Sequence, residues 1–201
     1  MLNKSKMTRF LSLSLAVAGF VLVGGHFAQT NAQVDPANKL LWRANVRRLD
    51  VEALRDSILF ASGKLDLKFG GPAVPLHDEK NFRRTLYGSI SRARPDVFLR
   101  LFDYPDPNET SEQRIDTNVP IQELFFLNSD FVRKQSEFLI ERLRGAGSEQ
   151  DKIKETYQIL FNRLPGRDEI SKGSGFLKGD GNSWPQYVQV LLSSNEFNFV
   201  R

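Results

Sequence analysis

The sequence contains no cysteine and only two histidines, His26 and His77, among its 201 residues. Without cysteine the chain cannot form a disulfide, an iron–sulfur cluster, a zinc ribbon or a Cys-x-x-Cys-His haem attachment. Two histidines are also too few for the usual zinc and non-haem iron sites, which take several imidazole or thiolate ligands. The composition therefore predicts a protein without cofactors that depends on its apolar core for stability.

The sequence also lacks the motifs of two common enzyme classes. No Gly-x-Ser-x-Gly turn is present, so there is no serine-hydrolase elbow for His77 to serve. No Gly-x-x-x-x-Gly-Lys-Ser/Thr loop is present, so the chain has no P-loop for a nucleotide phosphate. We therefore predict no catalytic residues.

No apolar run is long enough to span a bilayer comfortably. The longest run lies between Phe10 and Gly25, short of the roughly 20 residues that a membrane helix needs, and basic residues precede it. Small and polar residues follow, up to Ala32, as a signal peptidase requires. We predict a signal peptide over residues 1–32, export of the chain, and no stable membrane span after cleavage. The alternative is an uncleaved anchor helix. A lipid anchor is excluded, because the chain has no cysteine to carry it.

The chain has almost no net charge once the predicted signal peptide is removed. The whole chain has 28 Lys and Arg against 24 Asp and Glu, and the signal takes away three basic and no acidic residues. A nearly neutral mature chain has no general electrostatic affinity for nucleic acid. We therefore predict no nucleic-acid partner.

Helical periodicity dominates the rest of the chain. Between Asp50, a suitable N-cap, and Gly63, a suitable C-terminal stop, apolar residues recur at three- and four-residue spacing. This stripe consists of Val51, Leu54, Ile58 and Ala61. Further helical segments are predicted for residues 35–45, 97–102, 120–128, 129–145, 148–164, 167–177 and from 183 or 184 onward.

The predicted fold class is mainly α. Short strands or extended segments are expected near residues 65–69 and 82–90, where apolar and polar residues alternate. Residues 33–201 are expected to form a single small helical domain. The expected buried faces include Leu40, Leu41 and Ala44 in the first helix, and Ile121, Leu124 and Phe125 in the helix over residues 120–128.

Several pieces of the sequence, in order, resemble the C-terminal domain of large planctomycete surface proteins, a domain of unknown function numbered 1553. The pieces are LLWRANVRRLDVEALRDSILFASGKLD, GGP, RRTLY, LFDYPDP, QELFFLNSDFV, LFNRLPGRDE and LLSSNEFNFV. The resemblance covers residues 35–201. Proteins of this kind often carry a c-type haem domain and a long upstream part, so the resemblance implies a protein partner that supplies this missing part.

A second resemblance covers residues 153–197. The opening YQILFNRLP and the closing SSNEF are similar to helical repeats in secreted bacterial proteins. This resemblance implies packing and contact with partners rather than chemistry.

Four arginines are a candidate binding site: Arg43, Arg47, Arg48 and Arg55. They could form an anion-binding face or pair with nearby carboxylates. Phe126 is a second candidate, because it lies off the apolar stripe of its helix; it could contact a partner or pack under the 103–119 loop. In the Asp- and Pro-rich loop over residues 103–109, the oxygens of Asp103, Asp106 and Asn108 are a weak candidate for calcium, because the spacing is not that of an EF-hand.

The predicted function is a secreted, non-catalytic interaction or structural module that docks to a protein partner or to a cell-surface polysaccharide. The alternative is a hydrolase, or an accessory subunit of one, acting on surface or algal polysaccharide. A pair of carboxylates could serve such a reaction, but the sequence gives no basis for choosing two among 24 acidic residues.

Overall fold

The computed structural model describes residues 31–114, 117–178 and 183–200. Most of the predicted signal peptide and the turn predicted over residues 179–182 lie outside these ranges. The chain divides into two units, one ending at Val46 and one spanning Arg47–Val200. Within the described residues, no helix combines the length and the apolar character needed to cross a membrane.

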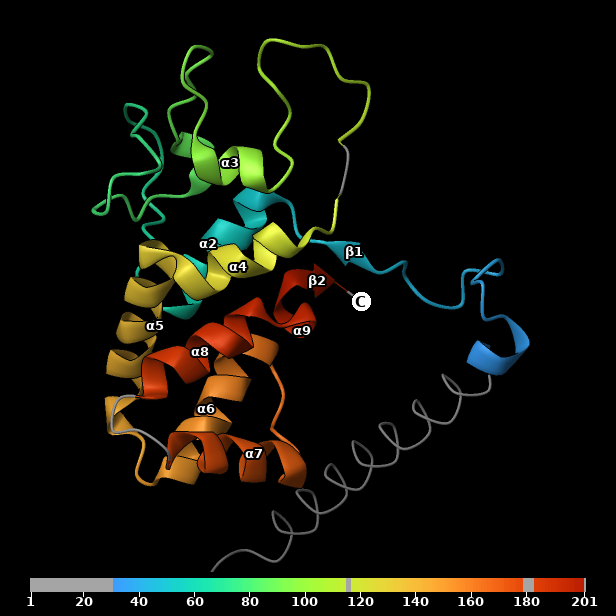
Figure 1. The fold of residues 1–201 in the computed structure, drawn as a ribbon, viewed down its shortest axis with the longest axis vertical. Coiled ribbons are helices and arrows are strands. Elements are labelled where there is room, and N and C mark those ends of the chain that lie inside the picture. The colour runs from blue at the N-terminus through green and yellow to red at the C-terminus, as the bar shows by residue number, and fades with distance from the viewer. Residues whose placement is uncertain (1–30, 115–116, 179–182, 201) are drawn as a thin grey trace, which may run out of the picture. The chain divides into compact units, whose positions relative to one another are not determined.

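The Arg47–Val200 unit is mainly helical, which confirms the predicted fold class (Figure 1). Its α-helices are α2 (Val51–Ala61), α3 (Val97–Leu101), α4 (Pro120–Asn128), α5 (Asp130–Arg142), α6 (Glu149–Phe161), α7 (Arg167–Leu177), α8 (Ser183–Ser193) and α9 (Asn195–Asn198). Two 3₁₀ turns, η1 (Thr85–Tyr87) and η2 (Leu143–Gly145), and two short strands, β1 (Arg47–Arg48) and β2 (Phe199–Val200), complete it.

Helix α8 is central to the packing, because it contacts α4, α5, α6 and α7 (Figure 1). The strands β1 and β2 pair antiparallel, with Arg47 opposite Val200, and so join the two ends of the unit. The sequence did not predict this pairing. It predicted short strands or extended segments near residues 65–69 and 82–90. The described chain has no named strand there, but these segments take part in the isolated bridges Asp66 to Arg83 and Val74 to Gly88, around the turn η1.

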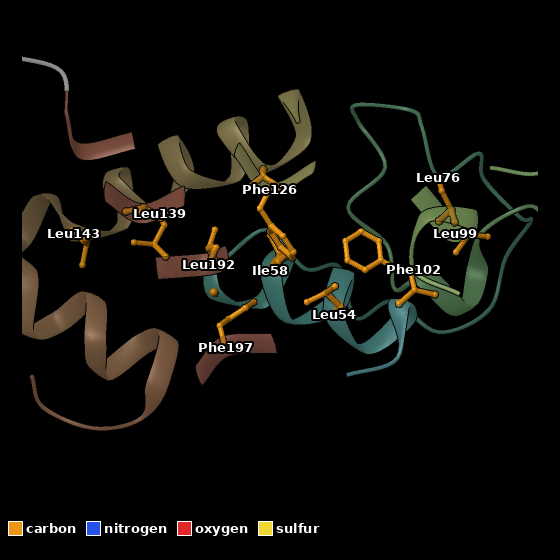
Figure 2. Packing of buried hydrophobic residues seen from close by; sticks show 14 residues of the cluster. Leu54, Ile58, Leu76, Leu99, Phe102, Phe126, Leu139, Leu143, Leu192 and Phe197 are labelled. Atoms are coloured by element: carbon orange, nitrogen blue, oxygen red, sulfur yellow. The ribbon is translucent and has the colours of Figure 1, made fainter. Parts of the chain in front are cut away.

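Helix α2 forms over the predicted residues, although Asp50 at its N-cap makes no side-chain capping hydrogen bond. All four residues of its predicted stripe are buried, and Gly63 takes the left-handed φ of +73° that ends the helix. Leu54 and Ile58 project into a core that also receives Phe102 and Phe126, as Figure 2 shows. Burial of each such side chain contributes about 1.5–3 kcal/mol.

The helix predicted over residues 35–45 is wrong. The chain there turns repeatedly, with Asn38 and Leu41 in the left-handed region at φ of 56° and 54°. Asp35 accepts hydrogen bonds from the backbone N–H groups of Lys39 and Leu40 through its carboxylate, so the side chain competes with the helical backbone pattern. Leu40 and Leu41, which were expected to be buried, are 77% and 76% exposed.

Helix α4 has the predicted limits, but its buried face is rotated from the predicted one, and of the three residues expected to be buried only Phe125 packs against the core. Its buried residues are Gln122 and Phe126, whereas Ile121 and Leu124 are 58% and 54% exposed. The polar Gln122 is held inside because its amide accepts a hydrogen bond from Arg48 and donates one to the Leu101 carbonyl. The aliphatic stripe of α4 consequently faces outward.

Candidate functional site

A groove of about 470 Å³ opens beside α3, at the junction of α4 and α5. The loop that contains His77 and the segment that precedes α3 complete its walls. Its volume is within the range of about 300–1,000 Å³ typical of ligand sites. We call it the aromatic groove, after the phenylalanines that line it.

Three phenylalanines from different elements line the groove, and Phe98 contacts the other two. Phe98 of α3 lies 5.1 Å, between ring centroids, from Phe125 of α4 and 6.3 Å from Phe131 of α5. These spacings are those of favourable aromatic pairs. The rings present carbon surface without hydrogen-bonding groups, so the groove favours an apolar ligand.

Exposed aliphatic side chains lie in the groove and outside it. Val97, which lines the groove, is 77% exposed, and Leu124, which precedes Phe125 and is outside the lining, is 54% exposed. Further aliphatic side chains of α4, Ile121 and Leu127, are also more than half exposed. Extended exposed apolar surface of this kind is typical of protein-interaction sites.

A buried arginine lies at the wall of the groove. Arg55 of α2 is 2% exposed and donates through Nη2 to the Asn81 carbonyl at 2.6 Å and through Nη1 to the Arg83 carbonyl at 3.0 Å. Burial lowers the pKa of Arg55, and the carboxylates of Asp56 and Asp96 oppose that shift. Arg55 thus joins residues 81–83 to α2 through hydrogen bonds and forms part of the groove wall.

The rim of the groove carries charges of both signs. The His77 imidazole lies 3.8 Å from the Asp96 carboxylate, and Lys134 pairs with Glu79. Asp96 also accepts the backbone N–H of Phe98 and so caps α3. His77 is 82% exposed in its side chain, so the rim is in contact with solvent.

Of the four candidate arginines, the three in the Arg47–Val200 unit do not form one exposed face, and Arg48 instead pairs with a carboxylate. Arg48 is buried and donates to Asp103 at 2.7 Å and to Gln122 at 2.6 Å. Arg55 donates to backbone carbonyls, whereas Arg47 is exposed on β1. Arg43 belongs to the other unit of the chain, where it stacks on its neighbour Trp42. Of these four, only Arg55 lines the aromatic groove.

Phe126 is not an exposed partner contact, because it is 2% exposed and packs against Phe102 and Phe125. The sequence left both partner contact and internal packing open for Phe126, because it assigned the outward stripe of α4 to the core and so made Phe126 the apparent outlier. The apolar contacts that sequence reasoning missed are Phe98, Phe125 and Phe131, and only their density in the sequence hinted at them.

The calcium candidates are engaged within the protein. The Asp103 carboxylate binds Arg48 and the backbone N–H and hydroxyl of Thr117, whereas Asp106 accepts the N–H of Asn108 two residues later. Burial raises the pKa of Asp103, but the hydrogen bonds from Thr117 and Arg48 outweigh burial and lower the pKa overall. Across the described residues, no three His, Cys, Asp or Glu side chains form a group that could hold a metal.

The fold and the groove define a small, mainly α-helical domain with an aromatic cleft bordered by exposed aliphatic side chains. Its family is established by sequence. Residues 25–177 match the model of the family described as PSD1, a protein of unknown function (DUF1553), and the chain belongs to that family. No curated protein and no solved structure matches the chain.

Proposed function

We propose that the chain is an exported, non-catalytic interaction module that docks a protein partner in the aromatic groove. The observation that carries this proposal is the contact of Phe98 with Phe125 and Phe131, with the exposed side chains of Val97 and Leu124 beside it. Burial of such surface against a partner supplies the main favourable free energy of association.

The chemistry of the groove favours a protein over a polysaccharide. Every sugar hydroxyl that is buried without a hydrogen-bond partner costs free energy, and phenylalanine rings offer no such partner. An aliphatic or aromatic side chain of a protein leaves no polar group unpaired when it enters the same surface. The charged rim, with His77 beside Asp96 and Lys134 beside Glu79, suits the polar margin of a protein interface.

Export is part of the proposal and is supported by the first 32 residues. Basic residues, a short apolar run and small residues up to Ala32 follow one another as in a secretory signal. The resemblance to planctomycete surface proteins supports the same location. Mass spectrometry of the exported chain tests it: an N-terminus at residue 33 is expected, and an intact Met1 would refute cleavage.

Docking is tested with matched variants of exposed aliphatic residues. Val97→Asp places a charge in the groove lining. The control Leu164→Asp places a charge at an exposed leucine, 67% exposed, that is outside the lining. We expect a partner from the exported fraction to be retained by the wild type and by L164D, and to be lost by V97D. Equal retention by V97D, or equal loss by L164D, would overturn the assignment of the groove.

The absence of turnover is tested separately. Purified protein incubated with surface polysaccharides should release no reducing ends. Release by the wild type that persists in V97D would replace the docking function with hydrolysis at another site.

A further inference from the structure

The turn over residues 35–45 is held rigidly although it is not a helix. The Asp35 carboxylate accepts the N–H groups of Lys39 and Leu40 at 3.0 and 2.7 Å, and its carbonyl accepts the Trp42 indole N–H at 2.8 Å. The Asn38 amide exchanges hydrogen bonds with the backbone of Arg43 at 2.9 and 3.1 Å. Asp35 and Asn38 are themselves 9% and 5% exposed.

The hydrogen-bonded turn holds two leucines, Leu40 and Leu41, with their side chains exposed. Leu40 and Leu41 are 77% and 76% exposed at the centre of the turn, and Leu41 has a φ of 54°, a conformation that is strained for a non-glycine residue. Hydrogen bonds on both sides fix this conformation before any partner binds. A turn that is ordered in advance loses less conformational entropy when it docks.

The chemistry of the turn is complementary to that of the aromatic groove. The leucines match the ring surface of Phe98, Phe125 and Phe131. Two cations, Lys39 and Arg43, flank the leucines. The groove lining has one more carboxylate than cation: the carboxylates are Asp78, Glu79, Asp96 and Asp130, and the cations are Arg55, Arg94 and Lys134. Apolar burial therefore supplies affinity, and the small opposite charges favour one orientation.

We infer that the Leu40–Leu41 turn of one copy of this chain docks in the aromatic groove of a second copy. This inference rests on the proposed docking function and names its occupant. The two surfaces that meet are different, so the contact is heterologous and leaves a free turn at one end and a free groove at the other. Association then continues into rings or open chains rather than stopping at a symmetric pair.

Sedimentation velocity of the exported chain over a series of concentrations tests the inference with two variants. The turn variant, L40S/L41S, retains the groove, and the groove variant, V97D, retains the turn. We expect the wild type and the control L164D to associate as concentration rises, and each of the two variants alone to associate at least about 30-fold more weakly. Mixed one to one, the turn variant and the groove variant should form a dimer, because the intact groove of one accepts the intact turn of the other.

A wild type that remains monomeric at every concentration would overturn the inference, and so would a mixture that does not associate. The proposed function is judged by a different result. If V97D loses a foreign partner while the wild type does not self-associate, the groove docks another protein and only the inference fails. If V97D changes neither property, both fail.

Discussion

The buried pair of Arg48 and Asp103 makes the sharpest prediction about stability. Arg48 donates to the Asp103 carboxylate, to the Gln122 amide oxygen and to the Thr117 carbonyl, and its side chain is 7% exposed. Asp103 is 19% exposed in its side chain and depends on this guanidinium for its charge balance. Arg48→Met removes the charge but keeps much of the packing, so Asp103 loses its cation and retains only its neutral donors such as Thr117, while the Gln122 oxygen loses the Arg48 hydrogen bond.

Removal of one partner from a buried pair costs about 3–5 kcal/mol. The partial exposure of Asp103 allows water to compensate, so we expect about 2–4 kcal/mol for Arg48→Met. At roughly 2–4 °C per kcal/mol for a domain of this size, the melting temperature should fall by about 4–16 °C. Arg47→Met, on the exposed neighbour in β1, should change the unfolding free energy by less than about 0.5 kcal/mol.

Urea unfolding of the wild type, R48M, D103N and the double variant measures the coupling directly. The effects should be non-additive by about 0.5–3 kcal/mol, because each single variant already disrupts the pair. Since the pKa of Asp103 is lowered in the folded state, its contribution is present above the unfolded value near 3.8 and is lost as pH falls below it. Equal losses for R48M and R47M, or additive effects in the cycle, would refute this reasoning.

Three further predictions concern other parts of the domain. Phe126→Ala should lower the unfolding free energy by about 3–5 kcal/mol in urea titrations, whereas Leu124→Ala on the outward face should stay within about 0.5 kcal/mol. Gly173→Ala should lower the unfolding free energy by about 1–3 kcal/mol, because the new Cβ would lie 2.6 Å from the Tyr187 hydroxyl. Adding Tyr187→Phe to this variant removes that hydroxyl and should restore part of the loss. Gly175→Ala, with open space around it, is the matched control and should be neutral or stabilising in the same thermal melts. Hydrogen bonds from Arg163 hold the pKa of Glu169 at about 2 in the folded protein, against 4.5 in the unfolded chain. The unfolding free energy should therefore fall as pH drops from about 4.5 toward 2, and E169Q should lack this part of the pH dependence.

Local signals in the sequence predict most helices correctly. The α7 limits, Arg167–Leu177, coincide with the predicted segment despite two internal glycines. The N-terminus of α6 is also as expected, because the Ser148 hydroxyl accepts the N–H of Asp151. Caps, glycine stops and apolar spacing act within a few residues, so these features can be read without the fold.

Features that depend on distant residues could not be read in this way. The orientation of α4 follows from Gln122, whose partners Arg48 and Leu101 are 74 and 21 residues away in the sequence. The turn over residues 35–45 was missed for a different reason. Its apolar spacing fits a helix, but Asp35 and Asn38 form side-chain hydrogen bonds with the backbone that only a non-helical chain allows.

The aromatic groove follows from the same polar network that misled the sequence reasoning. Arg48 needs acceptors, and Gln122 meets that need only when it faces inward, which turns Ile121 and Leu124 toward solvent. The same rotation places Phe125 against Phe98 at the edge of the core. A helix whose outward side is aliphatic gains nothing for folding from those side chains, since polar residues there would serve equally well. The stability of the domain therefore does not explain the exposed stripe, which is the kind of surface that the proposed docking function requires.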